Sequence, residues 1–360
     1  MPPIEWLQLP QEVLLHIFTF LSPTEKANVR ATCTYLRTLV DHPSLWKNSI
    51  IVFKSIGIYN ARFWDTLQNR KICSVEVSKV TLKQFKKMSS SLPDITNVRM
   101  DSCLKGEILQ GLQPLLNLKQ LQLSDCSNVT DHDLFTEIVF FQLLTHLSLC
   151  RVTFSSVLPL TSIVLLQNLY SLSLHSKEGI VPERALQYIL FRLPKLRELS
   201  LAIGNMNKWK LSLCFNMPDN FVSAFEGAAP FEPLMCPISS KLENLSVVGT
   251  QISNAALAWF SKSASGLKCL NLNFSYGYDE DVVKKFPCLF PQLQKLYLSN
   301  TRLTEESLLV LANLYSLQVL DISNNLHLTP EAILAFRKIT SNRIGLILER
   351  PIESVKYCCW

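Results

Sequence analysis

The sequence is poor in glycine and in charged residues for its length. Only 10 of its 360 residues are glycine, which excludes a collagen-like chain, and 18 prolines are too few for a linker-dominated one. Charged residues make up 18% and hydrophobic residues 48%, so a wholly disordered chain is excluded because the apolar side chains suffice for a core. This length predicts either two domains or one elongated repeat domain.

A strong excess of charge of one sign is also missing. The 35 Lys and Arg exceed the 29 Asp and Glu by 6, which is too dilute to predict binding to nucleic acid. Residues 152–176 carry no Asp, Glu, Lys or Arg, but proline, serine and amide side chains interrupt them. We therefore expect buried strands there and no membrane span.

Motifs for metals, nucleotides and secretion are absent as well. The eleven cysteines form no C-x-x-C, and no cluster of Cys and His predicts a metal site. The N-terminus has no basic and apolar segments of a signal peptide, so we expect a reducing compartment, the cytoplasm or the nucleus or both. The adjacent Cys358 and Cys359 do not form a prenylation motif.

Nothing in the sequence indicates an enzyme. The six histidines occupy six different local contexts, and the two expected on the inner surface, His146 and His175, have no acidic neighbour at a suggestive spacing. A nucleophile needs both a base and a group that orients the base. No Gly-rich phosphate loop or nucleophile-elbow motif is present, so we expect no catalytic residues, no metal and no cofactor.

What the sequence does contain is a repeat. The pattern L-x-x-L-x-L recurs in steps of 23–27 residues, with one longer step of 46 between 196 and 242. This period and pattern are typical of leucine-rich repeats. The first positions of the copies are Ile72, Ile95, Leu118, Leu144, Leu169, Leu196, Leu242, Leu267, Leu293, Leu317 and Ile344.

Each repeat predicts a strand, a turn and a helix. Alternating apolar and polar residues in the motif indicate a strand with one buried face. A hydroxyl residue then begins a helix at Ser253, Thr304 and Thr329. The predicted fold is an α/β solenoid of about ten or eleven repeats over 51–360, with parallel inner strands and outer helices. Residues 203–241 break the phase and predict an irregular insertion, or alternatively one degenerate repeat.

The first fifty residues follow a different pattern, that of three or four short helices over 3–50. Apolar residues from Val13 to Leu21 recur at helical spacing, and Ser22-Pro23-Thr24-Glu25 predicts a capping box that opens the next helix. Such a small all-α module has little core of its own. We expect it to pack on the solenoid, on a partner, or on both.

This N-terminal segment resembles an F-box. The resemblance rests on Leu9-Pro10-x-Glu12-Val13-Leu14-Leu15-x-Ile17-Phe18-x-Phe20-Leu21-Ser22-Pro23, followed by Pro43-Ser44-Leu45-Trp46. Leu36 stands where the family commonly has an aromatic residue, and Lys26-Ala27 replaces its usual leucine. Together with the repeats, the chain resembles the F-box/leucine-rich-repeat family.

The resemblance implies a non-catalytic adaptor. F-box proteins dock on a Skp-type adaptor and through it on the cullin and RING subunits of an SCF-type ubiquitin ligase, while the repeats bind the protein substrate. Matching the family motif residue by residue implies that these residues belong to the adaptor-binding module: Leu9, Pro10, Val13, Leu14, Ile17, Leu21, Ser22, Pro23 and Trp46. A repeat scaffold independent of ubiquitin machinery is the alternative.

Side chains between the core leucines are expected to line the inner surface of the arc. They are small, polar and of mixed charge, a lining that suits a protein partner better than a polyanion. The candidates for substrate contact are Gln122, His146, His175, Glu198, Asn271, Tyr297 and Asp321.

Overall fold

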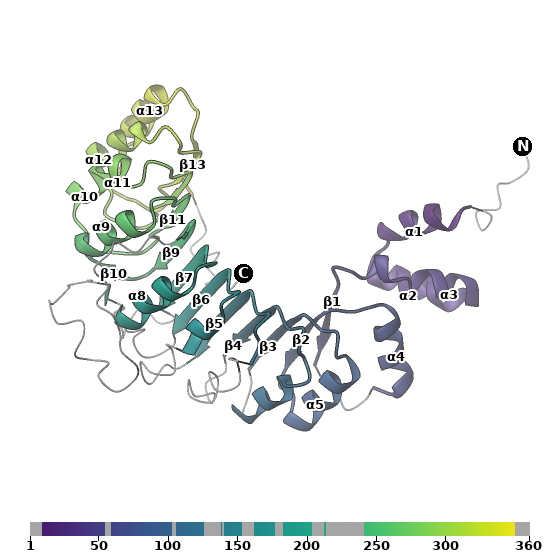
Figure 1. Cartoon of the computed structure of the whole chain (residues 1–360). Coiled ribbons are helices and arrows are strands. Elements are labelled where there is room, and N and C mark those ends of the chain that lie inside the picture. The colour runs from purple at the N-terminus through teal and green to yellow at the C-terminus, as the bar shows by residue number, and fades with distance from the viewer. Residues whose placement is uncertain are drawn as a thin grey trace, which may run out of the picture.

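The chain forms an arc in which one continuous sheet lines the inner side and helices line the outer side, as Figure 1 shows. This computed structural model describes residues 9–54, 59–102, 106–125, 138, 140–152, 162–176, 183–203, 212–213 and 241–349. Much of the predicted insertion 203–241 and the C-terminal Cys358–Cys359 lie outside the described residues. The N-terminal helices extend from one end of the arc, and α13 lies at the other.

The inner sheet has 12 strands, and every pair of neighbours is parallel. The predicted α/β solenoid is thereby confirmed. In order, the strands are β1 (Ile50–Phe53), β2 (Ser74–Ser78), β3 (Asn97–Asp101), β4 (Gln120–Ser124), β5 (His146–Val152), β6 (Ser171–Ser176), β7 (Glu198–Ile203), β9 (Asn244–Val248), β11 (Cys269–Asn271), β12 (Lys295–Tyr297), β13 (Val319–Asp321) and β14 (Gly345–Ile347).

The motif positions set the register of this sheet. Leu121 pairs with Leu147, and Leu270 pairs with Leu296, so identical motif positions stack from repeat to repeat. Their side chains are buried in one continuous apolar core. Strand β7 pairs directly with β9 across the long step, Glu198 opposite Asn244. The sheet therefore continues without a gap where the sequence leaves its regular phase.

Strand β1 lies outside the repeat pattern. It pairs with β2, Ile51 opposite Val75 and Phe53 opposite Val77, which places Asn48 where later repeats have their first apolar residue. The polar residue at that position explains why the L-x-x-L-x-L pattern begins only at Ile72. Phe53 is fully buried against the rings of Tyr59 and Trp64, whose centroids lie 5.7 and 5.6 Å from its own.

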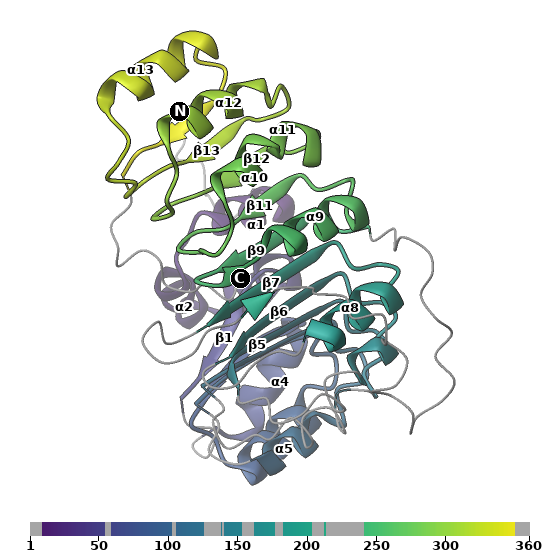
Figure 2. The same ribbon diagram turned by 90° about the vertical axis from the view of Figure 1, so that its left-hand side faces the viewer.

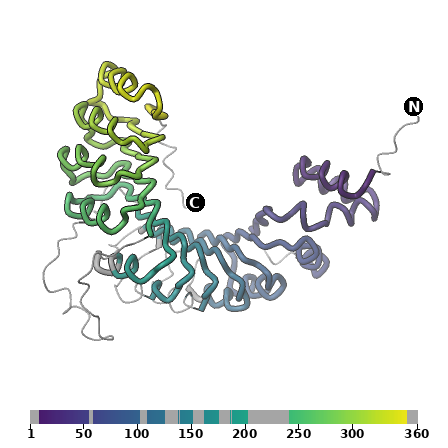
Figure 3. Tube along the Cα trace, turned by 45° about the horizontal axis from the view of Figure 1, so that its top comes forward, coloured from purple at the N-terminus to yellow at the C-terminus, as the bar shows by residue number. Residues whose placement is uncertain are grey.

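The outer elements begin where the sequence places helix caps. Ser253, Thr304 and Thr329 each accept a hydrogen bond from a backbone N–H three residues later, as predicted. The outer elements, stacked along the arc in Figures 2 and 3, are α4 (Ala61–Asn69), α5 (Leu82–Ser91), η3 (Gly106–Leu112), η4 (Ser162–Leu165), α8 (Glu183–Arg192), α9 (Asn254–Ser263), α10 (Glu280–Lys284), α11 (Phe286–Leu289), α12 (Glu305–Val310), η6 (Leu311–Asn313) and α13 (Pro330–Ile339).

A second, two-stranded pairing lies beside α9. It joins β8 (Ser212–Leu213) to β10 (Gln251–Ile252) in parallel. Ser212 and Leu213 are the only described residues of 204–240. The irregular insertion over 203–241 therefore stays a prediction.

Candidate functional site

The N-terminal module consists of α1 (Gln11–Thr19), α2 (Pro23–Thr32), α3 (Thr34–Val40) and η2 (Pro43–Leu45). The predicted capping box is confirmed: Ser22 Oγ accepts from Glu25 N at 3.3 Å, and Ser22 N donates to the Glu25 carboxylate at 2.7 Å. These hydrogen bonds from Ser22 lower the pKa of Glu25. The box fixes the sharp corner between α1 and α2.

Helix α1 has two apolar faces, and only one of them is used inside the module. Leu14 and Phe18, four residues apart, are buried against α3 and η2. On the other side Val13, Ile17 and Phe20 are 41%, 43% and 78% exposed. Spacings of four and three residues place these three on one stripe. The structure therefore leaves a ridge of apolar side chains in solvent on α1.

The residues predicted to contact the adaptor differ in their exposure to solvent. Pro10, Ser22 and Pro23 are exposed at the two ends of α1, whereas Leu9 and Leu21 are half-buried. Leu14 and Trp46 are buried, so the structure places them in the core of the module and not on its surface. We define the α1 ridge as Pro10, Val13, Ile17, Phe20 and Pro23. Phe20 was not among the predicted contacts, because the apolar face of α1 is wide and its sequence does not show which part of that face is exposed.

Trp46 joins the module to the solenoid. Its indole Nε1 donates to Val40 O at 2.6 Å, and the Arg70 guanidinium lies 3.8 Å from its ring centroid. Arg70 directly follows α4 of the first repeat. It also contacts Asp41 Oδ1, through Nε at 2.8 Å and Nη2 at 2.7 Å. Asp41 accepts a further bond from Arg30 of α2 at 2.9 Å. One carboxylate thus bridges the helical module and the repeats.

This bridge predicts a pH-dependent contribution to stability. Burial raises the pKa of Asp41, but the hydrogen bonds and charges of Arg30 and Arg70 outweigh it, and the pKa lies below its usual value. A lowered pKa in the folded state stabilises the fold above the ordinary carboxyl pKa of about 3.9, and the contribution is lost as the pH falls through the lowered value.

Asp41→Asn is therefore expected to lower the free energy of unfolding by about 1–3 kcal/mol at neutral pH, because two arginines lose a charged acceptor. The difference from the parent chain should shrink toward pH 3, measured by denaturant titration at several pH values. Asp65→Asn, at an exposed position of α4, is the matched control and should change little. An effect of Asp41→Asn that does not vary with pH would contradict the bridge.

Aligned rows of side chains cross the inner face of the sheet. The central row runs through Gln122, Ser148, Ser173, Ser200, Ser246, Asn271, Tyr297 and Asp321. Four of the predicted substrate contacts lie on this row. His146 and Glu198 lie on the row before it, and His175 lies on the row after it. The seven residues are thus spread along the arc and do not meet at one point.

Several of these side chains serve the solenoid itself. Asn271 Oδ1 accepts from Asn273 N at 3.0 Å, and Asp321 Oδ1 accepts from Ser323 N at 3.0 Å, so both stabilise the turn after their strand. Asp321 is fully buried, which differs from the expected surface position. The turn after β13 accounts for this burial, because Asp321 Oδ1 also accepts from the buried Ser323 Oγ at 2.7 Å.

The remaining candidates also have partners within the sheet. His175 is only 4% exposed, and its Nε2 lies 3.1 Å from Ser173 Oγ and 3.0 Å from Ser200 Oγ. Glu198 accepts from Asn244 Nδ2 at 3.2 Å. Gln122, His146 and Tyr297 are half-buried and remain the accessible ones. Contact of any of them with a substrate stays a prediction.

Metal and membrane features were sought in the same residues. Within the described ranges, no group of three or more His, Cys, Asp or Glu side chains is placed to hold a metal ion. None of the helices that the structure describes combines the length and apolarity needed to cross a bilayer.

Comparison with known proteins agrees with this architecture. Residues 6–51 match the F-box-like family, and residues 291–332 match the family of leucine-rich repeats in two copies. The mouse (Mus musculus) F-box and leucine-rich protein 22 is 30% identical over 129 residues, which are 34% of this chain and 53% of that protein. The match therefore spans about half the length of this curated relative.

Two solved structures show a more general likeness. The structure of the Rad7 and Elc1 complex from yeast aligns over 94% of this chain and 88% of that chain, with 16% identity and a TM-score of 0.49. The structure of a TLR13–ssRNA13 complex aligns over 72% and 37%, with 17% identity and a TM-score of 0.44. At these values neither likeness assigns a function. The F-box-like segment, the repeats and the mouse relative together support the assignment of this chain to the F-box/leucine-rich-repeat family.

Proposed function

We propose that the chain is the substrate-recognition subunit of an SCF-type ubiquitin ligase, acting in the cytoplasm, the nucleus or both. The α1 ridge docks on a Skp-type adaptor, the adaptor connects to cullin and RING subunits, and the repeats bind a protein substrate. The protein itself contributes no catalytic residue. Its effect on rate is that a tethered substrate lysine meets the charged conjugating enzyme at high effective concentration.

The observation that carries the proposal is the exposed α1 ridge. A small helical module does not leave three large apolar side chains in solvent on one stripe without cost, and a contiguous exposed apolar surface is typical of a protein interface. The ridge belongs to the segment that matches the F-box-like family. Proline at each end of α1 limits the conformational freedom that binding would otherwise remove.

The join between module and solenoid supports the same proposal. A receptor must hold its substrate at a defined distance from the ligase, which a freely hinged module would not do. Here β1 begins at Ile50, directly after the module, and the Asp41–Arg70 pair and the Arg70–Trp46 stack tie the two parts together. Side-chain contacts as well as the chain itself therefore join the module to the repeats.

Reconstitution tests the proposal against the alternative of a scaffold that is independent of ubiquitin machinery. The full chain is co-expressed with a Skp-type adaptor, and the purified pair is offered to cullin and RING subunits. We expect a stoichiometric complex in size-exclusion chromatography with light scattering, and transfer of ubiquitin within it when conjugating enzyme is added. A chain that stays monomeric beside the adaptor would support the scaffold.

A further inference from the structure

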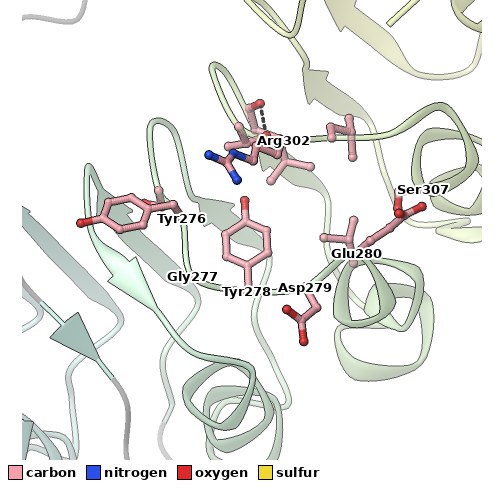
Figure 4. Close-up of a pocket in the computed structure, with 12 residues that line it drawn as sticks. Tyr276, Gly277, Tyr278, Asp279, Glu280, Arg302 and Ser307 are labelled. Atoms are coloured by element: carbon pink, nitrogen blue, oxygen red, sulfur yellow. Dashed lines mark hydrogen bonds between the residues drawn. The ribbon is translucent and has the colours of Figure 1, made fainter. Parts of the chain in front are cut away.

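A cavity of about 410 Å³ opens between two neighbouring repeats in the C-terminal half of the arc. Its walls are the loop from β11 to α10 and the loop from β12 to α12. Figure 4 shows the side chains of Tyr276, Tyr278 and Arg302 around it. The cavity lies where strands pass into the outer helices, apart from the α1 ridge and from the predicted substrate residues.

Glycine at 277 shapes the first wall. Its φ is +94°, and a Cβ built there would lie 2.9 Å from Gln251 Cγ and 3.2 Å from Ile252 O. Only glycine adopts this conformation without strain or displacement of its neighbours. The bend directs the neighbouring tyrosines differently: Tyr276 is exposed, whereas the ring of Tyr278 packs against the core. In Figure 4 the Tyr278 hydroxyl points toward Arg302.

The carboxylates around the cavity are already engaged. Glu280 Oε1 accepts from Thr304 Oγ1 at 2.5 Å and pairs with Lys284 at 3.2 Å. Asp279 accepts from Asn254 Nδ2 at 2.6 Å and points away from Arg302 in Figure 4. Arg302, by contrast, is exposed and has no ion pair or hydrogen bond with any residue in the described part of the chain. The cavity therefore presents a guanidinium that pairs with none of the described carboxylates, Asp279 and Glu280 of the same lining included.

Tyr278 adds a buried donor beneath this guanidinium. Its Oη is enclosed and has no hydrogen bond that satisfies normal geometry among the described residues. Burial raises the pKa of Tyr278 well above its ordinary value, against a smaller lowering by the Thr301 hydroxyl, so the phenol keeps its proton. A protonated phenol donates a hydrogen bond and so favours an acceptor in the same place as Arg302 does.

We propose that this cavity binds an oxyanion carried by a protein partner, the carboxylate of an acidic side chain or the phosphoryl group of a phosphorylated one. The guanidinium of Arg302 pairs with the oxyanion, the Tyr278 hydroxyl donates to it, and the exposed Tyr276 ring contacts the adjoining partner backbone. Charge complementarity selects this ligand class, because guanidinium and oxyanion form strong, directional hydrogen bonds. The proposal deepens the proposed function, since it gives the repeats a specific contact with their substrate.

Synthetic peptides test it. The purified full chain is titrated with N-acetylated, amidated peptides Gly-Ser-X-Ser-Gly in which X is Glu, phosphoserine or Gln, and binding is followed by ligand-detected NMR. We expect binding of the Glu peptide, the phosphoserine peptide or both, and none of the Gln peptide. Binding of one acidic peptide alone identifies the source of the oxyanion, and binding of both identifies a general oxyanion site.

Variants then locate the site. Arg302→Ala should weaken binding of the acidic peptides about tenfold or more, and Arg302→Lys should restore part of it. Tyr278→Phe keeps the ring and should weaken binding about 2–12-fold. Arg337→Ala removes the same charge from exposed α13 and should leave binding unchanged.

Equal binding of the Gln peptide, absence of binding at millimolar peptide, or an Arg302→Ala variant that binds as the parent chain does would overturn the proposal. Binding of the Skp-type adaptor is measured on the same proteins. Arg302 and the α1 ridge lie in different modules. A chain that binds the adaptor but none of the acidic peptides would therefore overturn this inference and leave the proposed function standing.

Discussion

Replacing Ile17 by Asp on the α1 ridge is expected to weaken binding of a Skp-type adaptor by at least about a hundredfold. The change removes an apolar contact worth about 1–3 kcal/mol and places a carboxylate without a partner in the interface, at a further cost of a few kcal/mol. Each 1.4 kcal/mol corresponds to a factor of ten in Kd. The measurement is a titration of the purified adaptor by calorimetry or surface plasmon resonance.

The matched control for this variant is Leu334→Asp. Leu334 is an exposed apolar residue of α13 at the far end of the arc, so the same change in charge there should leave adaptor affinity intact. Phe20→Ala, on the same stripe as Ile17, should weaken binding about tenfold. Both ridge residues are exposed, so the variants should unfold at the same temperature as the parent chain. Full adaptor binding by a folded Ile17→Asp chain would contradict the proposed F-box function. It would favour the alternative, a repeat scaffold that is independent of ubiquitin machinery.

The second large effect concerns the core of the solenoid. Leu296→Ala in β12 should lower the free energy of unfolding by about 2–5 kcal/mol, the usual cost of deleting a fully buried leucine side chain. Leu121→Ala in β4 should cost a similar amount. Because each repeat is stabilised by its neighbours, we expect the loss at 296 to be largest in β12 and the strands beside it. Denaturant titration measures the total loss of free energy of unfolding. Hydrogen exchange of the strand amides shows which strands are destabilised.

Leu326→Ala is the control for the core variants. Leu326 is 95% exposed in the turn after β13, so its truncation should change the free energy of unfolding by less than about 0.5 kcal/mol. A core variant whose effect is equally small would mean that the alternation assigned to the strand motif is wrong.

The strand motif is the part of this protein that its sequence specifies most fully. Leucines two positions apart with a polar residue between them, as at 121 and 123, lie on one common face when the segment is extended. The hydroxyl residues that begin α9, α12 and α13 are equally local signals, because the cap side chain reaches a backbone N–H only three residues away. Strand phase and helix start therefore follow from short stretches of chain.

The candidate site followed from the sequence only in part. The motif from Leu9 to Pro23 located the helical module and included Val13 and Ile17 of the ridge. The adaptor contacts predicted from the resemblance also included Leu14 and Trp46, which are buried, and omitted Phe20. The apolar face of α1 is wide, so the spacing of its residues alone does not tell which part of that face the rest of the module covers. Only packing of α3 and η2 against Leu14 and Phe18 decides that.

By itself, then, the sequence determined a parallel leucine-rich-repeat solenoid behind a helical F-box module, because both are encoded by contacts within one turn, one strand or one repeat. Tertiary structure alone decided the entry of β1 into the sheet, the burial of His175 and Asp321, the Asp41–Arg70 bridge and the cavity beside Arg302. For β1, the bridge and the cavity, the partners are separated by loops or by whole repeats: Arg70 lies 29 residues from Asp41. A periodic pattern states which residues are buried, but it does not state which neighbour from another repeat each of them meets, since that depends on how the repeats stack in space.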